Sequence, residues 1–214
     1  AKNNSIWFSK VSWCCTWPTF IFWKHCTNIK SKLLRANNML CKIRHYVSST
    51  TCRSIYYAIF NSHLTYACQI WGTNNNCLFQ GLFKLQCKAL RIIKFQNNQA
   101  QVNEIFSNSK IIKLQDIVNL WLHKFVFDFE NNNLPKIYDD YFQSLTDTHN
   151  HRTRGSLKDH LVLPTVKTTT YGIKSFKYQA CIFWNQLQDN HYTMVNRNCT
   201  KSLFENKLKI NIFL

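Results

Sequence analysis

The first 103 residues contain no aspartate and no glutamate, although they carry thirteen of the 27 lysines and arginines. All ten acidic residues lie at or after Glu104, so the net charge of +17 belongs mainly to the first half of the chain. Solvated protein faces usually mix both signs, and solubility alone does not require such a bias. A basic half with interleaved aromatic residues therefore predicts a polyanionic partner and favours nucleic acid.

Long apolar runs and Cys-x-x-C pairs are also missing. No stretch reaches the ~18 uninterrupted apolar residues of a membrane span, which argues against a membrane as the partner. Without a recognisable secretory leader, the ten cysteines are expected to be free thiols that act as small buried hydrophobes in a nuclear or cytoplasmic protein. Cys41 and His45 share an i, i+4 face, but two ligands do not make a structural zinc site. No metal or cofactor is expected in this chain.

The longest helical pattern runs from Ser49 to Gly72, and the rest of the chain is expected to be organised around it. Ser and Thr at 48–51 offer N-caps, and Gly72 offers a stop. Spacings of three and four residues predict one core helix of about five turns. The apolar or half-apolar residues that define its face are Cys52, Ile55, Tyr56, Ile59, Phe60, His63, Tyr66, Ala67 and Ile70.

Two further amphipathic patterns, at 30–46 and 78–95, flank this helix and predict a three-helix bundle. Each carries cations on its polar face. The first basic stripe consists of Lys32, Arg35 and Lys42. The second basic stripe consists of Lys84, Lys88 and Arg91, at steps of four and three. An ordinary solvated face and a nucleic-acid contact explain these stripes equally well, except that no carboxylate is present to pair with them.

The charges become mixed after residue 101, where a soft boundary is expected. A strong amphipathic helix spans 114–129 and ends before Pro135. Tyr138-Asp139-Asp140 is reminiscent of a polymerase Tyr-x-Asp-Asp turn, but one position is missing and no third Asp follows an upstream strand. Nothing upstream of Glu104 can contribute a carboxylate to a two-metal site. A solvated helix start is the preferred interpretation.

The segment that follows raises a different possibility, a metal-dependent hydrolase built on Asp139, Asp140, His149 and His151. Alternate histidines on a strand can share a metal ion. Arg152 and Arg154 repel a cation, so a basic loop near phosphate or a simple connector is preferred. Beyond it, residues 161–171 predict an edge strand, and helices are expected at 173–187 and 202–213.

Several of these motifs, in this order, resemble the region after the catalytic palm in reverse transcriptases of LINE-type retrotransposons (non-LTR, jockey/CR1-like). They include R-S-I-Y-Y-A-I-F-N-S-H-L-T-Y-A-C-Q-I-W-G, F-K-L-Q-C-K-A-L-R-I-I and T-Y-G-I-K-S-F-K-Y-Q-A-C-I-F-W-N-Q-L. The resemblance covers residues 30–214. It implies a thumb domain that grips the primer-template duplex, and a parent enzyme that uses Mg²⁺ in a palm that is missing here.

Residues 1–29 do not fit this resemblance. Their tryptophans and cysteines show no period of 2 or 3.6. Residues 10–29 can be back-translated so that the next reading frame gives K-Y-L-G-V-V-L-G-Q-H-L-S-F, which resembles what precedes the basic helix in the family. A mistranslated frame is therefore the preferred interpretation, with an irregular aromatic hairpin as the alternative.

These observations predict a mainly α fold: a thumb-like basic helical bundle at 30–100, a helical connector at 101–145 and a small α+β part at 146–214. The expected function is that of a reverse transcriptase fragment that binds RNA-DNA or DNA duplex without catalysing polymerisation. A host nucleic-acid-binding module is the alternative. The expected contact residues are Lys32, Arg35, Lys42, Lys84, Lys88, Arg91, Arg152 and Arg154.

Overall fold

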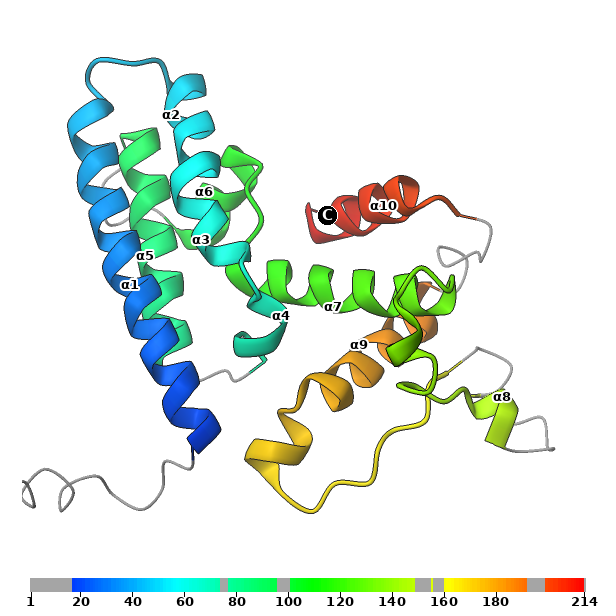
Figure 1. The fold of residues 1–214 in the computed structure, drawn as a ribbon. Coiled ribbons are helices and arrows are strands. Elements are labelled where there is room, and N and C mark those ends of the chain that lie inside the picture. The colour runs from blue at the N-terminus through cyan, green and yellow to red at the C-terminus, as the bar shows by residue number, and fades with distance from the viewer. Residues whose placement is uncertain are drawn as a thin grey trace, which may run out of the picture.

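The computed structural model describes residues 17–73, 77–95, 101–148, 155, 160–191 and 199–213. Helices dominate this part of the chain, which confirms the predicted mainly α fold (Figure 1). The first half contains α1 (Trp17–Ile43), α2 (Ser49–Ile55), the π-helix η1 (Tyr56–Asn61), α3 (Ser62–Thr65), α4 (Cys68–Trp71) and α5 (Cys77–Lys94). The second half contains α6 (Val102–Ser109), α7 (Leu114–Glu130), η2 (Lys136–Tyr138), α8 (Leu145–Thr148), the π-helix η4 (Thr169–Ile173), α9 (Phe176–His191) and α10 (Lys201–Phe213).

The predicted three-helix bundle is formed by α1, α5 and the continuous segment α2–η1–α3, which lie side by side (Figure 1). Each helix contributes a stripe of fully buried apolar side chains to one core. Ser48 caps α2 as expected, because its Oγ accepts a hydrogen bond from the Thr51 backbone N–H at 3.2 Å. Burial of these stripes, rather than helix propensity alone, holds the three helices in place.

The central segment is not the single α-helix that the pattern predicts. Its buried residues recur every four positions, at Cys52, Tyr56, Phe60, Leu64 and Cys68. In an α-helix of 3.6 residues per turn, each residue of such a series is rotated by about 40° around the axis from the one before it. The wider π-helical turn at η1 offsets this drift and keeps the stripe facing the core.

The helix also breaks at Tyr66 and Ala67, where Ala67 adopts a left-handed conformation with φ of 50°. Such a conformation costs a non-glycine residue about 1–2 kcal/mol. The Trp71 indole N–H donates to the Tyr66 carbonyl at 2.9 Å and satisfies one group that the break leaves unpaired. The prediction that Tyr66 and Ile70 lie on the core face is wrong, since they are 70% and 49% exposed.

Gly72 follows α4 and is required for a reason other than the expected helix stop. Its φ is −76°, which any residue adopts. A Cβ at this position would lie 2.4 Å from Val118 Cγ2 on α7 and 2.5 Å from the Cys68 carbonyl oxygen. Glycine therefore permits the close approach of α4 to α7.

The expected boundary at Lys30 lies inside α1, which is helical from Trp17 onwards. Cys26 and Ile29 are buried in the bundle core, and the His25 ring packs 6.2 Å from Trp71. An irregular segment is therefore the wrong description of residues 17–29, because this part continues the apolar stripe of the bundle. Residues 1–16 lie outside the described part of the chain.

The helix α6 was not predicted, because its sequence is mostly polar. It buries Ile105 and Phe106, and the Phe106 ring stacks on Phe83 of α5 with 5.8 Å between centroids. The chain then turns at Lys110, in a left-handed conformation, and enters α7. The α6 segment thus packs the start of the second half against the bundle.

The helix α7 runs from the bundle to the C-terminal part, where α9 and α10 pack against it (Figure 1). The Phe127 and Phe204 rings stack with 4.3 Å between centroids, and Trp184 of α9 packs against Phe204. The helices predicted at 78–95, 114–129, 173–187 and 202–213 all exist, with ends that shift by a few residues.

The predicted edge strand at 161–171 is wrong. Within the described residues, this region makes only an isolated β-bridge between Ser144 and Leu161. The side-chain amide of Asn185 on α9 pairs with the Leu161 backbone, accepting from its N–H at 2.8 Å and donating to its C=O at 3.0 Å. A side chain thus takes the place of a neighbouring strand, and the α+β character expected of this part is not observed in the described residues.

Candidate nucleic-acid interface

The second basic stripe lies on α5, on the side away from the bundle core. Lys84 and Lys88 are exposed, and the buried residues of α5, among them Leu82, Gln86 and Leu90, occupy the opposite side. The Cα positions of Lys84 and Lys88 are four residues apart, which is about 6 Å along the helix axis. Packing of α5 against the rest of the bundle therefore leaves both lysines directed at solvent.

Arg91 is the exception within this stripe. It is half-buried, and its Nε is buried without a hydrogen-bond partner among the described residues. Burial raises the pKa of the neighbouring Cys87 thiol, and the charges of Arg91 and Lys113 partly offset that rise. Arg91 therefore lies beside the junction of α5 with the α6–α7 connection, and it is a weaker candidate for phosphate contact than the two lysines.

The first basic stripe lies on α1, and Lys32, Arg35 and Lys42 are all exposed. Lys24 is exposed too and belongs to the same stripe, because it precedes Arg35 by eleven residues, close to a whole number of helical turns. Sequence reasoning missed Lys24 because it fell in the segment assigned to a wrong reading frame. Extending the helical period upstream of Lys30 would have found it.

The structure does not bring the two stripes together on one face. The α1 side that faces α5 carries Asn37, whose Nδ2 donates to the Leu85 carbonyl at 3.2 Å. At about 100° per residue, Lys32, Arg35 and Lys42 are each roughly 140° to 160° around α1 from Asn37. The first stripe points away from α5, so the two stripes cannot contact one straight duplex side by side.

A further group of cations lies at the end of the bundle where α1 finishes and α2 begins, and sequence reasoning did not single it out. The Arg44 guanidinium lies over the Phe95 ring at 4.7 Å, and its Nε donates to His45 Nε2 at 3.2 Å. The Arg53 guanidinium lies 5.8 Å from the Tyr57 ring. These arginines stand alone in the sequence without a helical period, so only the fold shows that they share one end.

The cations of the bundle make no ion pair in the described part of the chain. The ion pairs that form there all lie in the second half: Lys124 with Glu205 at 2.7 Å, Lys201 with Asp128 at 2.6 Å and Lys209 with Glu205 at 3.8 Å. His160 Nε2 lies 3.4 Å from Asp189 Oδ1, a contact that is ionic only when the imidazole is protonated. Because the first acid is Glu104, the bundle has no carboxylate of its own to neutralise them. Its positive field is therefore open to an external polyanion.

Of the residues considered for catalysis, the structure describes Asp139 and Asp140. Asp139 and Asp140 are exposed in the turn that follows η2, rather than at the start of a helix. Tyr138 packs its ring against Phe125, with 5.5 Å between centroids. His149, His151, Arg152 and Arg154 lie outside the described residues. Within the described part, no group of three or more His, Cys, Asp or Glu side chains could hold a metal ion.

The described cysteines differ in exposure, and Cys199 is half-buried. Cys26, Cys52, Cys68, Cys87 and Cys181 are buried thiols. Cys41 is exposed, so the small buried role expected of it is wrong. The His45 ring beside it is engaged with Arg44 and packs edge-on against Phe95, with 5.6 Å between centroids.

No family model matches this chain, and neither a curated protein nor a solved structure is significantly similar to it. In the part of the chain that the structure describes, none of the helices has both the length and the apolar character needed to cross a bilayer.

Proposed function

We propose that this chain binds the phosphate backbone of a nucleic-acid duplex, and that it is the post-palm part of a LINE-type reverse transcriptase. The observation that supports binding is the uncompensated charge of the bundle, whose described cations find no carboxylate partner. The exposed face of α5, with Lys84 and Lys88, is the primary contact surface. Contacts of this kind orient a protein on a duplex and carry no sequence information.

The first basic stripe on α1 is a second, separate surface. Because the first basic stripe points away from α5, a straight duplex bound to α5 does not reach it. Only a bent or longer nucleic acid contacts both surfaces. Primer-template binding therefore rests on α5, and the α1 cations add to the long-range attraction.

Fluorescence anisotropy with labelled duplexes tests this function. An RNA-DNA hybrid and a DNA duplex, each prepared in two unrelated sequences, should bind with affinities that differ by only a few fold between sequences. The logarithm of the association constant should fall linearly with the logarithm of salt concentration. Absence of binding at low salt, or a hundredfold preference for one sequence, contradicts the proposal.

The family assignment has its own test. Nucleotide sequence upstream of the coding region should encode a palm with Phe-Ala-Asp-Asp or Tyr-x-Asp-Asp, even if stops interrupt it. Introns and a promoter directly upstream would instead support a host nucleic-acid-binding module.

A further inference from the structure

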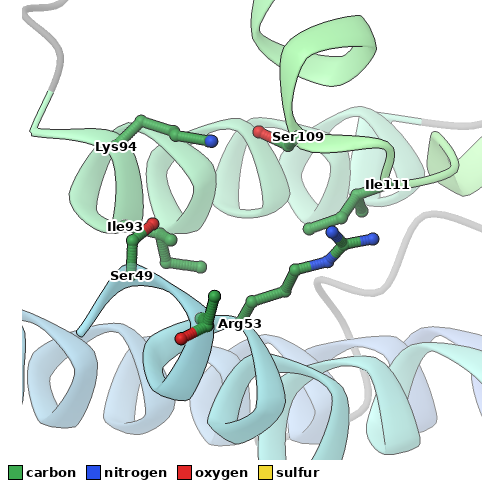
Figure 2. A pocket seen from close by; sticks show the side chains of 7 residues that line it. Ser49, Arg53, Ile93, Lys94, Ser109 and Ile111 are labelled. Carbon is green, nitrogen blue, oxygen red and sulfur yellow. The ribbon is translucent and has the colours of Figure 1, made fainter. Parts of the chain in front are cut away.

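A small cavity lies where α2, the end of α5 and the end of α6 meet. Its volume is about 90 Å³, and its lining residues are Ser49, Thr50, Arg53, Ile93, Lys94, Ser109 and Ile111. None of these seven residues carries a carboxylate. Figure 2 shows that Lys94 reaches in from α5 and Arg53 from α2, so two cations border one space.

Three lining residues carry hydroxyls, Ser49, Thr50 and Ser109, and among them Ser109 is the buried one. Ser109 is only 5% exposed, and its buried Oγ has no hydrogen-bond partner among the described residues. In Figure 2 the Ser109 oxygen and the Lys94 nitrogen point toward one another across the cavity. Burying a hydroxyl without a partner is costly, so the Ser109 hydroxyl calls for a partner such as a water, an ion or a ligand.

The Arg53 side chain is held in position by two contacts. One Nη2 N–H donates to the Lys110 carbonyl at 3.2 Å, and the guanidinium lies 5.8 Å from the Tyr57 ring. A guanidinium has five N–H donors, so most of the Arg53 donors remain available to a ligand. Lys94 is also positive, so an anion in the cavity is attracted by both side chains.

We propose that this cavity binds one phosphate group, with Arg53 and Lys94 supplying the charge and Ser109 donating a hydrogen bond. The volume of about 90 Å³ is well above the ~10–15 Å³ that one water needs on the same measure, so the cavity admits a tetrahedral oxyanion. The cavity is partly open, so the rest of a larger ligand extends from it into solvent. The phosphate comes either from a small molecule or from a nucleic acid, through its end or its backbone.

This site uses Lys94 at the end of α5 and does not include Lys84 or Lys88. Calorimetric titration of the full chain tests it. Inorganic phosphate is titrated at constant ionic strength, with chloride as the reference anion. The wild type should bind phosphate saturably, and Arg53→Gln and Lys94→Gln should each weaken binding at least tenfold. Ser109→Ala should weaken it severalfold. Ser107→Ala, an exposed serine on the same helix, and Lys136→Gln are the matched controls and should bind as the wild type does.

Thermal unfolding separates a binding role of Ser109 from a structural one. Without phosphate, Ser109→Ala should be at least as stable as the wild type, because the substitution removes a buried hydroxyl without a partner. Phosphate should raise the melting temperature of the wild type more than that of Ser109→Ala. A lower melting temperature of Ser109→Ala in the absence of phosphate, with equal phosphate shifts, would show that the hydroxyl serves the fold.

Competition with short single-stranded oligonucleotides identifies the source of the phosphate. If only a 5′-phosphorylated strand displaces inorganic phosphate, the source is a strand end. If the 5′-hydroxyl strand competes equally, the source is the backbone, and if neither competes, it is a small phosphate compound. The proposal is overturned if the heat of phosphate titration does not saturate. It is also overturned if Arg53→Gln and Lys94→Gln bind phosphate as the wild type does. Lys84→Gln/Lys88→Gln should leave phosphate binding intact, so failure of this site and failure of the duplex surface are distinguishable.

Discussion

Gln86 on α5 donates a hydrogen bond from its side-chain Nε2 to the Tyr56 hydroxyl on η1, at 3.1 Å, inside the bundle core. The same nitrogen donates to the Ile112 carbonyl at 2.9 Å, and the Gln86 Oε1 accepts from the Leu114 backbone N–H at 2.9 Å. One fully buried amide thus joins two bundle helices to the start of α7. Burial raises the pKa of Tyr56, so its hydroxyl stays protonated at physiological pH.

Gln86→Leu should destabilise the protein by about 2–5 kcal/mol, because the Ile112 carbonyl and the Leu114 N–H both lose their partner in the core. Urea unfolding followed by circular dichroism measures this change. Gln188→Leu is the matched control: Gln188 is equally buried, but its Oε1 has no partner among the described residues, so the cost should be well below that of Gln86→Leu. An equal loss of unfolding free energy in both variants would show that the Gln86 hydrogen bonds do not account for the destabilisation.

Acid should destabilise the fold through His123. Burial lowers the pKa of His123 below 6.5, although the hydrogen bond between its Nε2 and the Phe183 carbonyl, at 3.1 Å, acts in the opposite direction. A lowered folded-state pKa means that the unfolded chain takes up the proton first, so stability is present above pH 6.5 and is lost as the pH falls below it.

His123→Gln, which retains an N–H donor, should flatten the dependence of unfolding free energy on pH between about 7.5 and about 5.5, by up to about 1.4 kcal/mol per pH unit. The remaining slope should come partly from His25, whose pKa burial also lowers, with the nearby Lys32 charge as a second cause. His45→Gln, at an exposed position, is the control. A pH profile that His123→Gln leaves unchanged would contradict the burial of a neutral imidazole.

Thiol labelling tests whether residues 17–29 belong to the bundle. Burial raises the pKa of Cys26 from 9.0 to about 11, which reduces its thiolate fraction at neutral pH roughly a hundredfold. Under native conditions, iodoacetamide should therefore modify the exposed Cys41 at least a hundred times faster than Cys26, as measured by peptide mass spectrometry. Equal rates would mean that this part of α1 is not docked, as expected of a segment translated in the wrong frame.

The sequence predicted the helices whose apolar stripes follow the α-helical period, and α5 and α7 are the clearest cases. It could not show the π-helical turn at η1, because a step of four is also found in ordinary helices. Nor could it show the break at Ala67, where no glycine or proline marks the chain. The prediction of a strand at 161–171 failed because residues with high strand propensity form a strand only beside a neighbouring strand. Here the Asn185 side chain, instead of a second strand, bonds to the Leu161 backbone.

For the site, the periodic cations of α1 and α5 were found because a helix places every third or fourth residue on one face. Their separation onto different sides of the bundle depends on which flank of each helix is packed, and a single sequence does not contain that information. Arg53 and Lys94 are 41 positions apart and meet only through the packing of α2 against α5.

The chain alone should show no polymerase activity. Two-metal phosphoryl transfer needs several carboxylates that converge on cations about 3.5 to 4 Å apart. Asp139 and Asp140 lie exposed in one turn, and no acid precedes Glu104. With primer, template, dNTPs and Mg²⁺ or Mn²⁺, incorporation should not exceed that of a protein-free reaction, while a complete reverse transcriptase in the same buffer serves as the positive control. Template-dependent extension would refute the assignment as a part without the palm.

The salt dependence of duplex binding, compared between two matched variants, tests the central claim most directly. Lys84→Gln/Lys88→Gln removes the two exposed lysines of the second basic stripe, and Arg91 is left in place because its Nε is buried. Lys136→Gln/Lys167→Gln removes the same charge from exposed positions in the second half. Glutamine preserves helix propensity, so far-UV circular dichroism should be unchanged.

Each phosphate contact contributes about 0.9 to the slope of log K against log salt on duplex DNA. We expect the Lys84→Gln/Lys88→Gln slope to be smaller in magnitude than the wild-type slope by about 1.8, and the Lys136→Gln/Lys167→Gln slope to equal that of the wild type. Equal reductions in both variants, or none in either, would contradict a duplex surface on α5 and leave only a diffuse positive field.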